Sequence, residues 1–156
     1  MLILVSGLPG AGKSTIARKF CGQVVEADMF PGLYSEDVNG EVVFHGGEML
    51  NGVPRIKLAH QWCQRVARNL LEESIQEGGC TVVANTFSQK WETRAYFKMA
   101  EDLGVKCHLI DLYDQGLNDI QLAARNRHGV NAETIAKMRA RWMQGAAKVW
   151  RPTDWA

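Results

Sequence analysis

The sequence lacks a long apolar run, a paired cysteine motif and a strong excess of charge. None of its apolar runs approaches the roughly 20 residues that a membrane-spanning helix needs. The apolar start, Leu2–Val5, has no basic region before it as a signal peptide would. Four cysteines are widely spaced without a C-x-x-C pair, so we interpret them as reduced core thiols rather than as a metal site or disulfide framework. These absences predict a cytoplasmic protein that does not use a membrane.

The balance of charged and apolar residues is that of an ordinary globular chain. The 156 residues are 46% hydrophobic and 22% charged, which suits a single domain over residues 1–156. The formal net charge is only +1, so the chain as a whole has no general attraction for nucleic acid. Residues 1–114 carry 11 basic and 14 acidic side chains, whereas residues 115–156 carry seven basic and three acidic ones. A basic C-terminal third can face ATP, another polyanion or only solvent.

The segment Gly7–Ser14 matches G-x-x-x-x-G-K-[ST], the phosphate-binding loop of nucleoside triphosphate enzymes. Leu2–Val5 precedes it as a buried strand would, and Thr15–Phe20 can continue as a helix. In this setting backbone N–H groups surround a phosphate, Lys13 bridges the β- and γ-phosphates, and the Ser14 hydroxyl holds Mg²⁺. The pattern therefore predicts ATP and Mg²⁺ as cofactors, with contacts from Gly7, Pro9, Gly10, Ala11, Gly12, Lys13, Ser14 and Thr15.

Strand and helix patterns alternate along the chain and predict an α/β fold. Helices are expected over residues 55–77 and 91–103, ended by Gly78-Gly79 and by Gly104. This alternation favours a short parallel sheet covered on both faces, which gives a three-layer α/β sandwich. The predicted strands are Leu2–Val5, Gln23–Ala27, Cys80–Ala84 and Val105–Leu112.

Two regions interrupt the alternation. In residues 31–54, Asn39-Gly40 is a hairpin signal and predicts a small β-flap. Residues 118–131 include a break between two basic helices, with Asn131 as an N-cap for the second helix. A break of this kind is what a mobile lid over phosphates needs, with Gly129 as its hinge.

The remaining polar residues favour a small kinase over other P-loop proteins. The chain has no guanine-reading N-K-x-D motif and no acidic Walker B strand, which argues against a GTPase or a motor. Asp28 follows a predicted strand and is the candidate general base, although it can also be an N-cap or a loop carboxylate. Arg125 and Arg127 are candidate clamps for the transferred phosphoryl group, but two residues apart on a helix they cannot both point the same way.

Other polar and aromatic residues allow two interpretations each. Asn85 and Thr86 end the third predicted strand, where they can orient water, metal or acceptor, or simply cap the next helix. His60 either faces an acceptor groove or packs inside the protein. His108 is expected to be structural and buried. Trp62 and Trp91 are expected in the core, unless an acceptor base stacks on one of them.

Several segments together resemble the polynucleotide-kinase-like group of P-loop kinases, which includes AAA-type kinase domains of similar length. The resemblance covers nearly the whole chain. It implies that Lys13, Ser14 and Thr15 contact phosphate and magnesium, that Asp28 is the base, and that Arg125 and Arg127 are lid arginines. One departure is that Ala84 stands where the third strand of this group usually has an aspartate. The segments that carry the resemblance are Gly7–Thr15, Glu26–Phe30, Leu58–Trp62, Val82–Thr86 and Leu122–Val130.

The resemblance implies a kinase that transfers the γ-phosphate of ATP to a hydroxyl on nucleic acid. The first choice of acceptor is the 5-hydroxymethyl group of hydroxymethyluracil in phage DNA, and the host cytoplasm is then the location. Three alternatives remain open: a polynucleotide 5′-hydroxyl kinase, a nucleoside or small-molecule kinase, and a non-catalytic ATP-binding regulatory protein. The sequence does not determine the oligomeric state.

Overall fold

The protein is built on a four-stranded parallel sheet. The computed structural model describes residues 1–20 and 22–142. The sheet has the strand order β2-β7-β1-β8, so β1 lies between β7 and β8. All four predicted strands are present, although Ala27 lies in a short 3₁₀ helix instead of β2. The strands are β1 (Leu2–Ser6), β2 (Gln23–Val25), β7 (Thr81–Asn85) and β8 (Cys107–Asp111).

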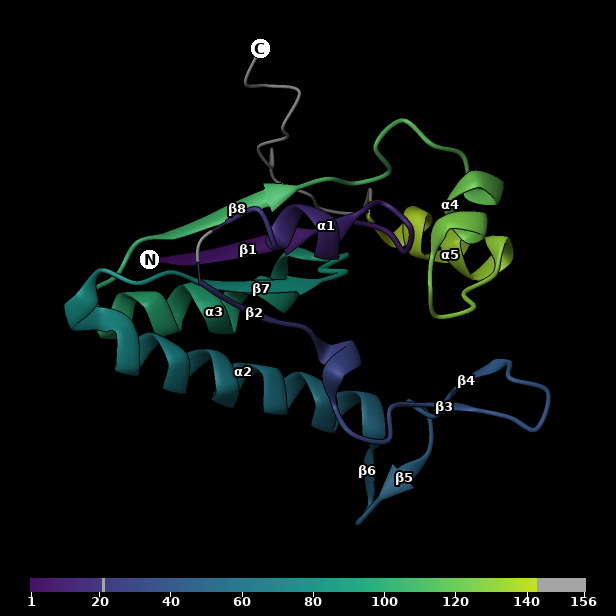
Figure 1. Cartoon of the computed structure of the whole chain (residues 1–156), viewed down its shortest axis with the longest axis horizontal. Helices are drawn as coiled ribbons and strands as arrows, with labels where there is room; N and C mark the ends of the chain where they lie inside the picture. The colour runs from purple at the N-terminus through teal and green to yellow at the C-terminus, as the bar shows by residue number, and fades with distance from the viewer. Residues whose placement is uncertain (21, 143–156) are drawn as a thin grey trace.

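Helices cover both faces of the sheet and give three layers (Figure 1). One face packs against α2 (Arg55–Ser74) and α3 (Lys90–Leu103). The other packs against α1 (Lys13–Ala17), α4 (Asp119–Arg125) and α5 (Ala132–Trp142). This arrangement confirms the predicted α/β sandwich.

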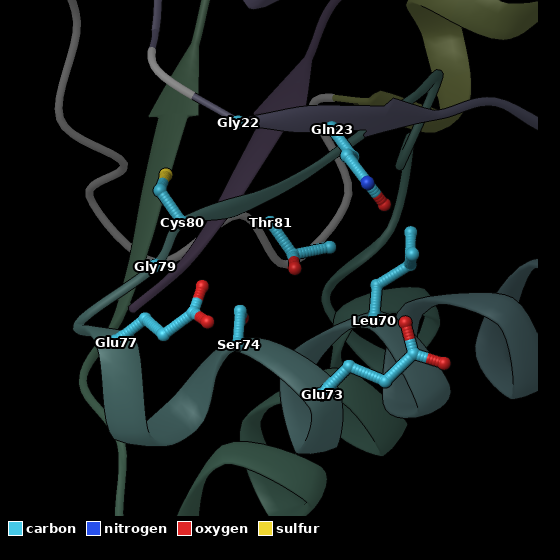
Figure 2. A pocket seen from close by; sticks show the side chains of 9 residues that line it. All are labelled: Gly22, Gln23, Leu70, Glu73, Ser74, Glu77, Gly79, Cys80 and Thr81. Atoms are coloured by element: carbon cyan, nitrogen blue, oxygen red, sulfur yellow. The ribbon is translucent and has the colours of Figure 1, made fainter.

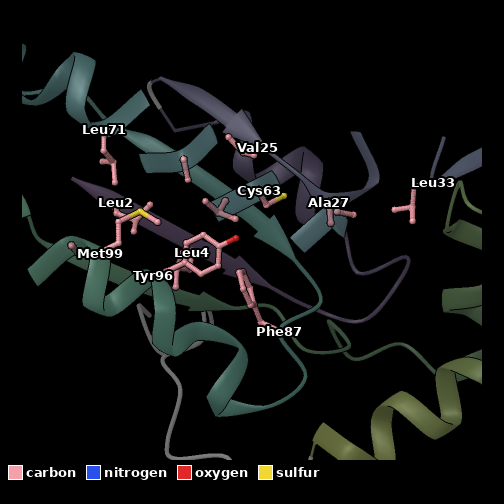
Figure 3. Packing of buried hydrophobic residues seen from close by; sticks show 14 residues of the cluster. Leu2, Leu4, Val25, Ala27, Leu33, Cys63, Leu71, Phe87, Tyr96 and Met99 are labelled. Atoms are coloured by element: carbon pink, nitrogen blue, oxygen red, sulfur yellow. The ribbon is translucent and has the colours of Figure 1, made fainter. Parts of the chain in front are cut away.

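Alternating side chains of each strand feed the two cores, as the pleat of a strand requires. Leu2 and Leu4 of β1 belong to the core under α2 and α3, whereas Ile3 and Val5 belong to the core on the opposite face. Figure 3 shows the first of these cores, where Tyr96 and Met99 of α3 lie beside Leu2 and Leu4.

Glycines end two of the helices at the predicted places. Helix α2 continues into a 3₁₀ turn, η2 (Ile75–Glu77), which is capped by Gly78 with a φ of 66°. Helix α3 ends at Gly104, whose φ is 67°. Both values lie in the left-handed region that glycine adopts without a Cβ clash. Helix α1 is shorter than expected, because it ends at Ala17 and not at Phe20.

Two predictions about buried side chains are wrong. His108 is exposed, because β8 is an edge strand of the sheet. Trp91 is 64% exposed, because α3 turns a different face to the sheet, the one with Thr93, Tyr96 and Met99. Trp62 is half-buried and packs edge-on against Phe30, with 5.9 Å between the ring centres. The periodicity therefore identified the helices but not their buried faces.

The predicted hairpin around Asn39-Gly40 is present, and a second hairpin follows it. Strands β3 (Tyr34–Glu36) and β4 (Val42–Phe44) pair in antiparallel fashion around Asn39-Gly40, and β5 (Met49–Leu50) pairs with β6 (Val53–Pro54). The Asp37 carboxylate accepts hydrogen bonds from the backbone N–H groups of Asn39 and Glu41, which fixes the turn. The flap lies at the same end of the molecule as α4 and α5 (Figure 1).

The two helices expected around the break near residue 128 are present as α4 and α5. Between α4 and α5, Asn131 accepts a hydrogen bond from the Thr134 N–H at 2.9 Å, as an N-cap does. Lys148 and Arg151, two of the basic residues counted in the C-terminal third, lie outside the described residues. No helix within residues 1–20 and 22–142 has both the length and the apolar character to cross a membrane.

Candidate active site

The phosphate-binding loop connects β1 to α1 and lies against α4. Gly10 and Gly12 have φ values of 84° and 91°, which only glycine adopts easily. A Cβ on Gly10 would lie 2.2 Å from the backbone oxygen of Leu122 in α4, whereas one on Gly12 would meet nothing within 4 Å. The Gly7 N–H donates to the Thr86 oxygen at 3.3 Å. The loop thus hydrogen-bonds to the residue that follows β7 and packs closely against α4.

Lys13 is the cation of this loop. Its Nζ donates to the Leu8 oxygen at 3.2 Å. Burial lowers the pKa of Lys13 to about 8, although the charges of Asp28 and Glu26 act in the opposite direction. Two carboxylates are therefore close enough to Lys13 for their charges to act on it.

Glu26 contacts the loop serine directly. It follows β2 and is the residue before the 3₁₀ helix η1 (Ala27–Met29), and its carboxylate accepts a hydrogen bond from the Ser14 hydroxyl at 2.5 Å. The strand predicted over Gln23–Ala27 includes Glu26, and Asp28 is the carboxylate that the sequence favours as the general base. The available signal was the position of Glu26 at the end of β2, where a side chain points toward the loop edge of the sheet.

Asp28 lies in η1 with its side chain 38% exposed, and it meets residues from two distant segments. Its Oδ2 is 3.0 Å from Nε2 of His128, and the Tyr34 phenol hydrogen-bonds to it. Burial alone would raise the pKa of Asp28. The hydrogen bond and charge of His128, the charge of Lys13 and the Tyr34 hydroxyl outweigh burial, so the pKa lies below its usual value.

Asn85 holds the backbone that carries Asp28. Its Oδ1 accepts from the Ala27 N–H at 2.8 Å, and its Nδ2 is 4.0 Å from the Cys63 sulfur. The following helix α3 is capped by Gln89 and Glu92, so the capping role considered for Asn85 and Thr86 is wrong. Asn85 is 6% exposed. It acts on the site through Ala27.

His60 lies half-buried on α2, and burial lowers its pKa against the opposing charges of Glu92 and Asp28. The imidazole is therefore neutral near pH 7. Its contact with acceptor remains a prediction.

Arg125 and Arg127 are both exposed, and neither makes a hydrogen bond or ion pair with the described residues. Arg125 is the last residue of α4, and the cap residue Asn126 is already extended, so Arg127 lies beyond the helix. The helical-spacing argument against both arginines facing one side is consequently wrong. Their contact with phosphate stays a prediction.

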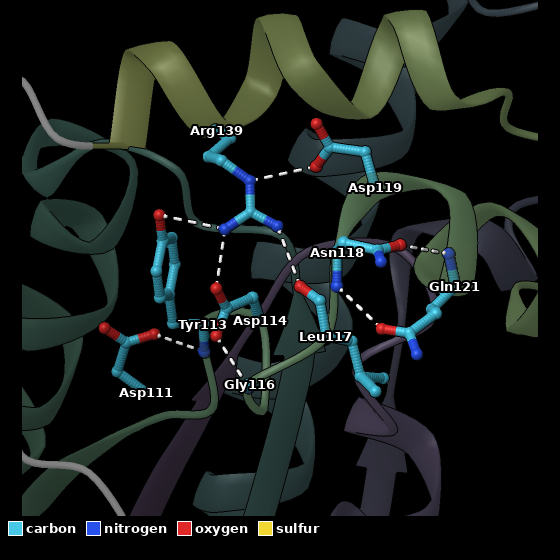
Figure 4. A network of polar contacts seen from close by, with 9 residues as sticks. All are labelled: Asp111, Tyr113, Asp114, Gly116, Leu117, Asn118, Asp119, Gln121 and Arg139. Carbon is cyan, nitrogen blue, oxygen red and sulfur yellow. Dashed lines mark hydrogen bonds and ion pairs between the residues drawn. The ribbon is translucent and has the colours of Figure 1, made fainter.

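Arg139, another basic residue of the C-terminal third, binds several neighbouring groups. Arg139 of α5 donates to Asp114 at 2.6 Å, to Asp119 at 2.9 Å and to the Leu117 oxygen at 3.0 Å (Figure 4). It also lies over the Tyr113 ring, 5.3 Å from the centre. Arg139 therefore joins α5 to the segment between β8 and α4.

A pocket of about 260 Å³ lies far from the loop, between the C-terminal part of α2 and the starts of β2 and β7 (Figure 2). Its lining includes Gln23, Glu73, Glu77 and Thr81. Because ligands of parallel α/β sheets bind at the carboxyl ends of the strands, this pocket at the amino ends is not part of the candidate site.

The sheet order, the glycine loop after β1 and the acidic residues after β2 define a P-loop protein with the kinase-like α/β fold. The chain belongs to the family described as AAA domain, whose model matches residues 2–145. Human NEDD4-binding protein 2 is 30% identical to it over 145 residues, which are 88% of this chain but 7% of that relative.

Solved structures share the fold. A sugar kinase from Janibacter sp. HTCC2649 superposes with a TM-score of 0.54 at 17% identity, over 96% of this chain and 82% of the kinase. The tunicamycin resistance protein of Deinococcus radiodurans gives a TM-score of 0.50 at 14% identity, over 94% of this chain and 84% of its own. At these identities the likeness concerns the fold alone.

Proposed function

We propose that this protein is an ATP-dependent phosphotransferase that acts on a hydroxyl group. The observation that carries the proposal is the convergence of Lys13, Ser14 and Asp28 at one edge of the sheet, where the charge of Lys13 acts on Asp28. Phosphoryl transfer needs a cation that binds the triphosphate and a carboxylate that accepts the hydroxyl proton, and Lys13 and Asp28 are suited to these two roles.

In this mechanism the acceptor oxygen attacks the γ-phosphorus, the bond to the β-phosphate oxygen breaks, and ADP leaves. Asp28 accepts the hydroxyl proton, which its low pKa permits because the carboxylate is ionised near pH 7. The Lys13 ammonium stabilises negative charge on the phosphates, as in other P-loop enzymes. The exposed Arg125 and Arg127 of the lid would contact the phosphates of bound ATP.

The oxygens of Ser14 and Glu26 fit Mg²⁺, which prefers hard oxygen ligands and keeps several waters. No cluster of three His, Cys, Asp or Glu residues suited to a metal occurs within the described part of the chain, which agrees with an ion held mainly by phosphates and water. When bound, Mg²⁺ would neutralise charge on the phosphates. Glu26 would then supply the carboxylate that Ala84 cannot.

The flap favours a small acceptor without phosphates. Residues 31–54 contain four carboxylates and no lysine or arginine. The same segment exposes apolar side chains, namely Val38, Val42, Val43, Phe44, Met49 and Leu50. A polyanion would be repelled from this surface, whereas a nucleoside or another small alcohol would not.

A nucleic-acid hydroxyl is the second candidate. It is favoured by the resemblance to polynucleotide kinases and by the exposed Arg125 and Arg127 at the end of α4, the helix whose Leu122 lies near the loop. Binding should then weaken with salt on a shallow slope, about 0.9 per phosphate neutralised on duplex DNA. Neither the hydroxymethyl group of hydroxymethyluracil nor a phage origin has a supporting observation in the described residues.

An acceptor screen with γ-labelled ATP separates these possibilities. Its arms are free nucleosides and sugars, DNA with a 5′-hydroxyl, and duplex DNA with hydroxymethyluracil. Label on a small alcohol, lost in Lys13→Ala, is the expected result. Label only on DNA would establish the second candidate. ATP binding without transfer to any hydroxyl would identify a non-catalytic regulatory protein instead.

A further inference from the structure

The loop between α4 and α5 brings one histidine to the candidate base. His128 lies 100 residues after Asp28 in the sequence, yet its Nε2 is 3.0 Å from the Asp28 Oδ2. Its ring also stacks on Tyr34 of the flap, with 4.5 Å between ring centres and 26° between planes. Lid, flap and base therefore meet through three side chains.

The loop is organised to present this histidine. The Asn126 side chain accepts from the backbone N–H groups of His128 and Val130 and donates to the oxygens of Ala123 and Val130. Gly129 has a φ of 70°, and a Cβ there would lie 3.8 Å from Val42 of the flap. The segment Asn126–Val130 is thus a closed turn that rests against β4.

We propose that His128 is a positioning residue for Asp28, so that closing the lid and orienting the base are one event. This proposal rests on the proposed function. The imidazole N–H fixes one carboxylate oxygen, and the two oxygens together have lone pairs for the Tyr34 phenol and for an acceptor hydroxyl. His128 gives this hydrogen bond both as an imidazolium and as the neutral Nε2–H tautomer.

The electrostatics agree with this arrangement. The hydrogen bond to Asp28 raises the pKa of His128, with further support from the charges of Asp28 and Glu26, while burial and Lys13 oppose it. Above the usual pKa of Asp28 and below that of the paired His128, both groups are charged. The pair is weakened, but not broken, when His128 loses its proton, because the neutral ring still donates.

The kinetic test compares three variants by hydrolysis of saturating Mg²⁺-ATP, with water as the acceptor. His128→Ala should lower kcat about 10- to 100-fold, the cost of a misplaced catalytic group, with little change in KM for ATP. His128→Gln keeps a donor and should recover most of the rate. His108→Ala, an exposed histidine on β8, is the control and should match the wild type.

Two kinetic results would overturn the proposal: an unchanged kcat in His128→Ala, or equal losses in the Ala and Gln variants. A structural role would instead move melting temperature and KM together with kcat.

Imidazole NMR on the full chain separates this proposal from the proposed function. In Asp28→Asn the pKa of His128 should fall, and a His128 pKa that does not respond overturns the pairing. If the wild type shows no ATP turnover that depends on Lys13, the proposed function fails, and the NMR result alone then decides whether His128 pairs with Asp28.

Discussion

The two sides of the candidate site are built by different means. The phosphate side is one continuous segment, Gly7–Ser14, whose backbone conformation is set by glycines at positive φ. The acceptor side is assembled from η1, the flap and the lid, which meet at the side chains of Asp28, Tyr34 and His128 and where Gly129 lies near Val42. The first is local in the sequence, whereas the second depends on contacts among three separate segments.

The two sides also differ in charge and exposure. Burial in the loop lowers the pKa of Lys13, whereas the flap is acidic and exposes apolar side chains. Surface loops with few buried contacts open more easily than core strands, so the acceptor side is where motion and specificity belong. The phosphate side therefore identifies the class of protein, whereas under the proposed function the choice of acceptor depends on the other side.

The largest effect is expected on the phosphate side. Lys13→Ala should abolish phosphoryl transfer, because it removes the ammonium group that the loop holds for the phosphates, and it should leave the fold intact. Steady-state ATP turnover and far-UV circular dichroism check both parts. Lys19→Ala removes an exposed lysine just after α1 and is the matched control. Normal turnover in Lys13→Ala would mean that the loop assignment is wrong.

On the acceptor side, Asp28→Asn should lower kcat by about 10²-fold, the usual contribution of a positioned base. ATP affinity should change little, because the carboxylate is not in the loop. Kinetics and calorimetric titration with ATP measure the two quantities. Asp102→Asn on α3 is the control, since that exposed carboxylate faces only Lys98. Parallel losses of affinity and rate would show that Asp28 is structural.

The sequence predicts the phosphate side almost completely and the acceptor side only in outline. The backbone conformation of a contiguous motif is set by its own residues and by the strand before it. In the same way Gly78, Gly104 and Asn39-Gly40 end helices or form a turn through their own backbone conformation. The hydrogen bonds of Glu26 with Ser14 and of Asn85 with Ala27 join residues 12 and 58 positions apart, so no local pattern encodes them.

His128 illustrates the limit most clearly. The sequence marked its segment as a break between helices and as part of a family-like motif. It could not show that the break folds back onto Asp28, because that contact depends on where the sheet and the flap bring each segment. The predictions that Trp91 and His108 are buried were wrong for a related reason. Hydrophobic periodicity does not show which face of a helix or strand another element covers.

A matched glycine pair tests how the two sides are joined. Gly10→Ala and Gly12→Ala carry similar backbone strain, with φ values of 84° and 91°, but only Gly10 approaches Leu122 of α4. Gly10→Ala should therefore be less stable than Gly12→Ala by about 1–3 kcal/mol, the cost of overpacking. Urea unfolding measures the difference. Equal stabilities would mean that α4 moves away freely.

The smallest expected effect concerns the lid itself. Addition of Mg²⁺ and a non-hydrolysable ATP analogue should slow amide exchange in residues 118–131, because exposed Arg125 and Arg127 gain a phosphate partner. A coupling of about 1 kcal/mol corresponds to roughly fivefold slower exchange. Residues 34–44 of the flap, which contact the lid but carry no cation, are the internal comparison.

Slowing in the lid of the wild type but not of the Arg125→Ala, Arg127→Ala double variant would assign the effect to the arginines. Slowing in neither protein would mean that these side chains only face solvent, and the acceptor side would then be closed by the contact of His128 with Asp28 alone.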